Sequence, residues 1–182
     1  HRLAAVPGSS SPADGVVFIE QPPAAAVLLS SADTDLLAID PLLAQEPQLL
    51  GAELRGLNLS ALGHPAQIDH YLSSTVRHAQ LVVVRLLGGR GHWSYGLERL
   101  QDWARSQPGR QLLVLAGTPE EEVTLASLGT VDPALAVALA LAWSRWRPAW
   151  LAAMQLPLVL FGVAALEPLI GLGDRVRQLP VR

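Results

Sequence analysis

The sequence predicts an α/β fold with a mainly parallel sheet. Short, almost wholly apolar segments alternate with longer segments in which apolar residues recur at helical spacing. The apolar segments end in polar or glycine-rich turns, as strands buried on both faces of a parallel sheet do. The 182 residues suffice for one sizeable core, so two full domains are not expected.

The first elements lie before residue 45. Residues 15–20 (GVVFIE) predict an edge strand, and the continuous apolar run 24–29 predicts a strand buried on both faces. Asp33 or Thr34 then caps a short helix, whose length Pro41 and Pro47 limit because proline has no backbone N–H.

The middle of the chain contains the clearest strand. Residues 54–59 (LRGLNL) predict a second parallel strand, and His64 opens a helical stretch that ends near residue 79. Residues 80–87 (QLVVVRLL) are β-branched, almost wholly apolar and followed by two glycines. We therefore expect this strand at the centre of the sheet.

The alternation continues beyond residue 90. Residues 94–105 predict an amphipathic crossover helix with Tyr95 on its apolar side, and 111–116 predict the next buried strand. Residues 118–121 (TPEE) form a capping box for a short helix, and Asp132 caps an Ala- and Leu-rich helix. The pattern predicts a small parallel-sheet domain of the Rossmann-like or flavodoxin-like kind, with right-handed crossovers.

The character of the sequence changes near Trp143. We expect an α/β domain over residues 1–142 and an apolar, helical C-terminal tail over 143–182. Residues 149–166 contain a single polar side chain and reach the lower length limit of a membrane span. Pro157 interrupts the run, so membrane contact through 149–166 is an alternative that we do not favour.

Composition excludes several functions. The chain has no Lys and no Cys, which excludes a P-loop lysine, a Schiff base, thiolate metal sites and disulfides. Its net charge of −3 argues against nucleic acid as a partner. The first residues lack the apolar run of a signal peptide, so we expect a cytoplasmic protein.

The carboxyl ends of the predicted strands carry the candidate ligand-binding residues, because parallel α/β sheets bind ligands there. A glycine-rich loop that leads into a helix also favours an anion. The predicted ligand-binding residues are Ser30, Asp33, Arg85, Gly88, Gly89 and Arg90. The alternatives are a turn that needs glycine for its backbone angles, and a structural ion pair of Arg85 with Glu20 or Asp33.

No catalytic or metal site is predicted. The five histidines are not spaced to bind a metal from one helical face, and Asp33 and Asp35 more naturally cap a turn than bind a cation. Trp93 and Tyr95 beside the glycine loop are candidates to stack on a planar ligand, with a core position as the alternative.

Two segments carry a resemblance to a known family: residues 15–39 and, more sharply, LVVVRLLGGRGHWSYGLERL (81–100) followed by QLLVLAGTPE. They resemble the N-terminal region of the cobaltochelatase large subunit CobN, which is related to the magnesium chelatase H subunit. The resemblance runs to about residue 140 and is most specific over 82–96. It implies a segment of an enzyme that forms nitrogen–metal bonds, inserting Co²⁺ into the tetrapyrrole hydrogenobyrinic acid a,c-diamide in cobalamin biosynthesis.

The implied complex also contains the remainder of the large subunit, an AAA+ ATPase and an accessory chelatase subunit, and uses ATP, Mg²⁺ and Co²⁺. The resemblance assigns no catalytic residue or cofactor to this chain, so we expect no chelation by it alone. The alternative is a stand-alone α/β module that binds a small molecule or an anion without catalysis, with or without a membrane tether. After residue 140 the sequence departs from the family, which predicts a frameshift or premature ending and a poorly ordered tail.

Overall fold

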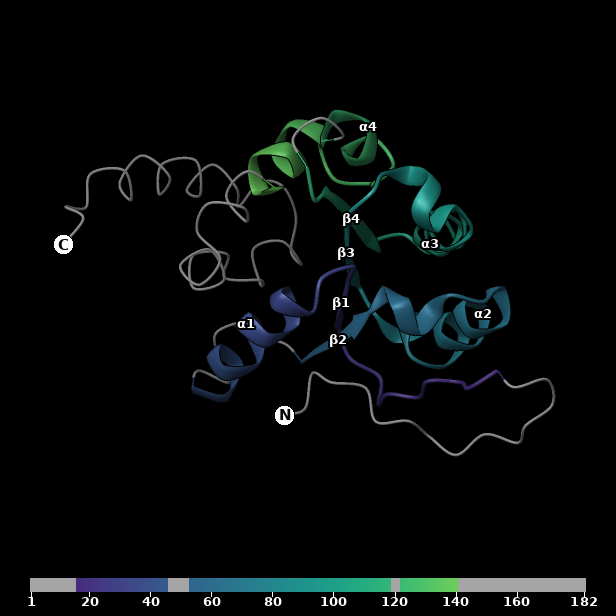
Figure 1. The fold of residues 1–182 in the computed structure, drawn as a ribbon. Helices are drawn as coiled ribbons and strands as arrows, with labels where there is room; N and C mark the ends of the chain where they lie inside the picture. Colours follow the sequence, from purple (N-terminus) through teal and green to yellow (C-terminus); the bar gives the residue numbers. More distant parts are fainter. Residues whose placement is uncertain (1–15, 46–52, 119–121, 141–182) are drawn as a thin grey trace.

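The computed structural model describes residues 16–45, 53–118 and 122–140. Four strands form one parallel sheet in the order β2-β1-β3-β4 (Figure 1). The strands are β1 (Ala26–Ser30), β2 (Leu54–Asn58), β3 (Leu81–Leu86) and β4 (Gln111–Ala116). The α/β prediction is confirmed, and β3 lies at the centre of the sheet as expected, next to β1.

Helices cover both faces of the sheet, which lies between them in Figure 1. They are α1 (Asp33–Gln45), α2 (Pro65–Ser74), α3 (Ser94–Arg105) and α4 (Glu122–Ala126), and residues 133–140 are also helical. Because the chain passes from β1 to β2 in one direction and then crosses back to β3, crossovers of one hand place α1 opposite α2 and α3.

Strand alternation divides the core into two layers. Side chains such as Leu29 and Val84 pack with α2 and α3, whereas Leu28 and Val83 pack with α1 and the helix at 133–140. Leu125 of α4 joins the first layer and its neighbour Ala126 joins the second, so α4 lies at the β4 side of the sheet. Both faces of the sheet are therefore buried.

Two predictions about the first elements were wrong. Residues 15–20 do not form an edge strand, because within the described part only Ile19 makes an isolated bridge. Side chains hold this segment instead: Gln67 Nε2 donates to the Val17 carbonyl at 2.8 Å, and Gln21 Nε2 donates to the Gly56 carbonyl at 3.0 Å. In addition, α1 continues across Pro41, although an interior proline removes a backbone hydrogen bond and crowds the preceding turn; the helix ends at Gln45, before Pro47, the other proline expected to limit it.

The helix caps largely follow the sequence signals. His64 caps α2, with its Nδ1 accepting from Ala66 N at 3.1 Å, and Asp132 Oδ1 accepts from Ala134 N at 2.8 Å. The predicted α3 has the expected bounds, but Tyr95 is exposed rather than packed in the core. The 118–121 capping box and the tail lie outside the described residues.

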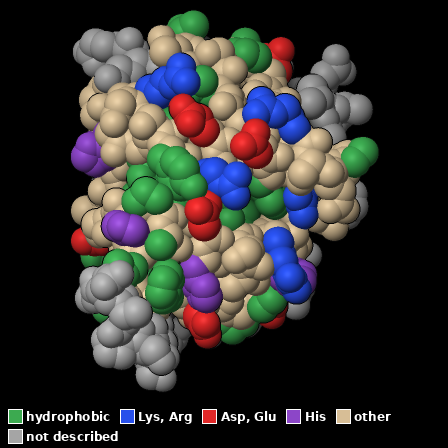
Figure 2. All heavy atoms as spheres, turned by 90° about the vertical axis from the view of Figure 1, so that its right-hand side faces the viewer, with side chains coloured by type: hydrophobic (Ala, Val, Ile, Leu, Met, Phe, Trp, Pro, Cys, Tyr) green, Lys and Arg blue, Asp and Glu red, His purple; other side chains and the backbone are tan. Residues whose placement is uncertain are grey.

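The outer surface of α2 and α3 is a mixed charged face, on which acidic and basic side chains are interspersed (Figure 2). Arg99 Nε contacts Asp69 Oδ1 at 2.8 Å, and the Tyr95 hydroxyl donates to Asp69 Oδ2 at 2.8 Å. The hydrogen bond to Asp69 raises the pKa of Tyr95, because ionisation would place a second negative charge there. Exposed pairs of this kind contribute only about 0–1 kcal/mol.

Tyr71 of α2 is expected to make the protein sensitive to alkali. Its ring is fully buried, its hydroxyl donates to Gln21 Oε1 at 2.5 Å, and burial raises its pKa well above the ordinary value of 10.0. Above about pH 10 the unfolded chain loses this proton while the native state keeps it, so the free energy of unfolding falls by up to about 1.4 kcal/mol per pH unit.

Urea unfolding at pH 8, 10 and 11 measures this slope. Tyr71→Phe should flatten the decline above pH 10, although it also removes a buried hydrogen bond. Tyr95→Phe, which removes an exposed phenol, should leave most of the decline in place. An identical slope in wild type and Tyr71→Phe would contradict the prediction.

Candidate functional site

The carboxyl edge of the sheet brings the predicted site residues together. Ser30, Asn58 and Arg85 occupy one register level of β1, β2 and β3. Alternation places these three side chains on the face that α1 covers, since their neighbours Leu29 and Val84 belong to the opposite layer. The strand order reverses between β1 and β3, which makes this the topological switch point of the sheet. Parallel α/β sheets bind ligands at the carboxyl ends of the strands beside such a point.

Arg85 makes a buried ion pair. Its Nη1 lies 2.8 Å from Asp35 Oδ2, and the side chains of Arg85 and Asp35 are 6% and 0% exposed. Ser30 Oγ donates to the same Asp35 oxygen at 2.5 Å and accepts from Ala32 N at 3.1 Å. This polar cluster joins β1, β3 and the first turn of α1.

The expected partner of Arg85 was wrong. Neither Glu20 nor Asp33 provides its carboxylate: Glu20 Oε1 lies 3.3 Å from His70 Nε2, and Asp33 Oδ1 accepts from Asn58 Nδ2 at 2.6 Å. Asp35 was missed as the partner. The signal that identifies it is the strand alternation, which places Arg85 on the face covered by the acidic first turn of α1.

The glycine loop needs its glycines for backbone conformation. Gly88 has φ +94° and Gly89 has φ +74°, both in the region that favours glycine. The turn that they form supports the conformational interpretation of the loop. Gly91 differs, because a Cβ there would meet nothing within 4 Å and no positive φ requires glycine.

Arg90 is the basic candidate at the surface. It begins the 3₁₀ turn η3 (Arg90–Trp93), is exposed, and pairs with no carboxylate among the described residues. Asp33 is also exposed, whereas Ser30 and Gly89 are buried. The edge therefore divides into an accessible part around Arg90 and a buried part around Arg85, and ligand binding by either stays a prediction.

The aromatic residues beside the loop have different positions. Trp93 is a core residue, 7% exposed, and its Nε1 donates to the Leu62 carbonyl at 3.0 Å. Tyr95 contacts Asp69 on the mixed charged face. The two rings are thus engaged elsewhere, rather than paired around a planar ligand.

Metal-binding and membrane-spanning features were sought only in the part of the chain that the structure describes. There, no three residues of the types His, Cys, Asp and Glu are grouped closely enough to hold a metal ion. Within the same ranges, every helix is too short or too polar to cross a membrane.

The fold and site define a parallel α/β domain with helices on both faces and a polar cluster at its topological switch point. No family model matches the chain. Two curated proteins do: the aerobic cobaltochelatase subunit CobN of Pseudomonas aeruginosa, 33% identical over 134 residues, and that of a Sinorhizobium species, 35% identical over 131 residues. Each match covers 72% of this chain.

The chain is therefore related to CobN, as its sequence predicted, and it spans about a tenth of the length of these relatives. The catalytic subunit of cobaltochelatase from Mycobacterium tuberculosis has a similar fold, with a TM-score of 0.54 and 22% identity. That similarity covers 78% of this chain and 10% of the solved structure.

Proposed function

We propose that this chain forms an N-terminal part of a cobaltochelatase large subunit, in an assembly that inserts Co²⁺ into hydrogenobyrinic acid a,c-diamide with ATP and Mg²⁺. The match to two CobN subunits over 72% of the chain carries the proposal. In this role the α/β domain docks onto the remainder of the large subunit, and the AAA+ ATPase and accessory subunit complete the complex.

Affinity purification tests this assignment. The tagged chain is expressed with the remainder of a CobN subunit and, separately, with the ATPase and accessory subunits. We expect the remainder of the large subunit to co-purify. Cobalt insertion should require the complete set of subunits, so insertion by this chain alone with ATP would contradict the proposal, as would failure to retain the remainder of CobN.

Arg90 provides a more local test. Its charge is exposed beside the Gly88–Gly89 turn, at the edge where the chain and a neighbouring domain or an anionic tetrapyrrole group would meet. Arg90→Ala is expected to weaken retention of the CobN remainder about tenfold. Stability should change by no more than about 0.5 kcal/mol, as is usual for an exposed side chain.

Arg105→Ala is the matched control. It removes another exposed arginine, from α3, where Arg105 pairs with Asp102 at 2.6 Å on the mixed charged face. Retention measured for both variants at equal protein concentration distinguishes docking at the loop from a general loss of charge. If Arg90→Ala unfolds the protein, or if both variants bind equally, the loop is structural rather than a docking site.

A further inference from the structure

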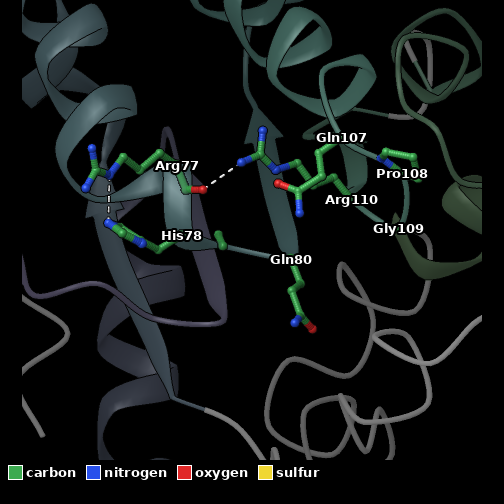
Figure 3. A pocket seen from close by; sticks show the side chains of 8 residues that line it. Arg77, His78, Gln80, Gln107, Pro108, Gly109 and Arg110 are labelled. Atoms are coloured by element: carbon green, nitrogen blue, oxygen red, sulfur yellow. Dashed lines mark hydrogen bonds between the residues drawn. The ribbon is translucent and has the colours of Figure 1, made fainter.

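A cavity of about 520 Å³ opens at the amino ends of β3 and β4 (Figure 3). Arg90 follows the carboxyl end of β3 and so lies at the opposite end of the strands. It lies between η2 (Val76–His78) and the turn that joins α3 to β4. The residues around it are Arg77, His78, Ala79, Gln80, Gln107, Pro108, Gly109 and Arg110. Among the described residues, this lining combines two arginines and a histidine and contains no carboxylate.

Arg110 is fixed in place by neutral groups. Its Nη1 donates to the Trp103 carbonyl at 3.0 Å and to Ser106 Oγ at 2.7 Å, and its Nη2 donates to the Arg77 carbonyl at 2.7 Å. The guanidinium also stacks 5.0 Å from the centre of the Trp103 ring. These contacts position the guanidinium without neutralising its charge.

Arg77 is exposed at the same cavity, but its side chain extends away from Arg110 toward His78, and only its backbone carbonyl contacts Arg110 (Figure 3). Arg77 Nε donates to His78 Nε2 at 2.7 Å, so this partner too is not a carboxylate. Across the described ranges, neither Arg77 nor Arg110 lies within ion-pair distance of a carboxylate. Four other arginines of the domain have such partners, namely Arg55, Arg85, Arg99 and Arg105, whereas the exposed Arg90 has none among the described residues.

A purely structural role accounts for part of this arrangement. Arg110 donates to the Trp103 carbonyl near the C-terminus of α3, where positive charge is favourable. That role does not require Arg77 at the same cavity, nor the lack of acidic side chains among the described lining residues. Two uncompensated guanidinium groups are suited to carboxylates, whose two oxygens match the planar guanidinium.

We propose that this cavity, with Arg77 and Arg110, binds a carboxylate-bearing ligand. The carboxylates come either from a small free polycarboxylate or from acidic side chains of a neighbouring polypeptide segment. The proposal rests on the charge and geometry of the cavity, and does not depend on the assignment to cobaltochelatase.

Calorimetric titration of the whole chain at low ionic strength tests it, with citrate in one arm and a capped tetraglutamate peptide in the other. We expect saturable 1:1 binding in at least one arm, weakened at least tenfold by Arg77→Gln. Arg99→Gln is the matched control: it removes the same charge from a residue already paired with Asp69, and should change binding less than twofold.

Arg110→Gln should also abolish binding, but its thermal unfolding must be measured because it removes contacts to Trp103 and Ser106. Tighter binding of citrate identifies a small ligand, and tighter binding of the peptide identifies a polypeptide segment. Absence of saturable binding in both arms, or equal weakening by Arg77→Gln and Arg99→Gln, would overturn the proposal.

Discussion

Asp35→Ala is expected to destabilise the domain by about 3–5 kcal/mol, the usual cost of removing one partner from a buried ion pair. The carboxylate lies 2.8 Å from Arg85 Nη1 in a setting where both side chains are almost inaccessible. Its removal leaves the guanidinium buried without that counter-charge. Ser30 Oγ loses its acceptor at the same time.

Thermal and urea unfolding measure the effect, which corresponds to a lowering of Tm by about 6–20 °C for a chain of this size. The double variant Asp35→Ala/Arg85→Met is the control, because it removes both charges and keeps much of the side-chain volume. It should be clearly more stable than Asp35→Ala alone. If the two are equally unstable, the pair is not the cause of the loss.

Gly96→Ala is expected to destabilise the domain by about 1–3 kcal/mol, the usual cost of overpacking a core. Helix propensity alone predicts the opposite, since alanine is favoured over glycine in a helix interior by about 1 kcal/mol. A Cβ at Gly96, however, would overlap the six-membered ring of Trp93. Trp93 would then have to move and lose its hydrogen bond to the Leu62 carbonyl.

Gly91→Ala is the matched control, because its Cβ would meet nothing within 4 Å, and its stability should stay within about 0.5 kcal/mol of wild type. In a Trp93→Leu background the smaller side chain removes the overlap with the Cβ. The double variant Trp93→Leu/Gly96→Ala should therefore have a higher free energy of unfolding than Trp93→Leu alone. The comparison uses the free energy of unfolding in urea. A stabilising Gly96→Ala would show that the ring moves at little cost.

The relationship to CobN was accessible from the sequence because the segment from β3 into α3 carries a dense pattern: a strand with an internal arginine, the glycine turn, and then Trp93 and Gly96. The structure explains why these residues occur together. Gly88 and Gly89 adopt positive φ, and Gly96 provides the space for Trp93.

The basic cavity was not predicted. Its two arginines are 33 positions apart, and no motif links them. Both line the same cavity because η2 and the α3–β4 turn each bring the chain back to the amino ends of the parallel strands. Sequence reasoning considered the carboxyl edge, where such sheets usually bind ligands.

The sequence by itself determined the α/β class, the bounds of α3 and β4, and the central place of β3, because these follow from local periodicity and from the apolar character of doubly buried strands. Only the tertiary structure decided which carboxylate faces Arg85 and which of the candidate residues are accessible. Those outcomes depend on the strand register and on the face that α1 covers, and residues far apart in the chain set both.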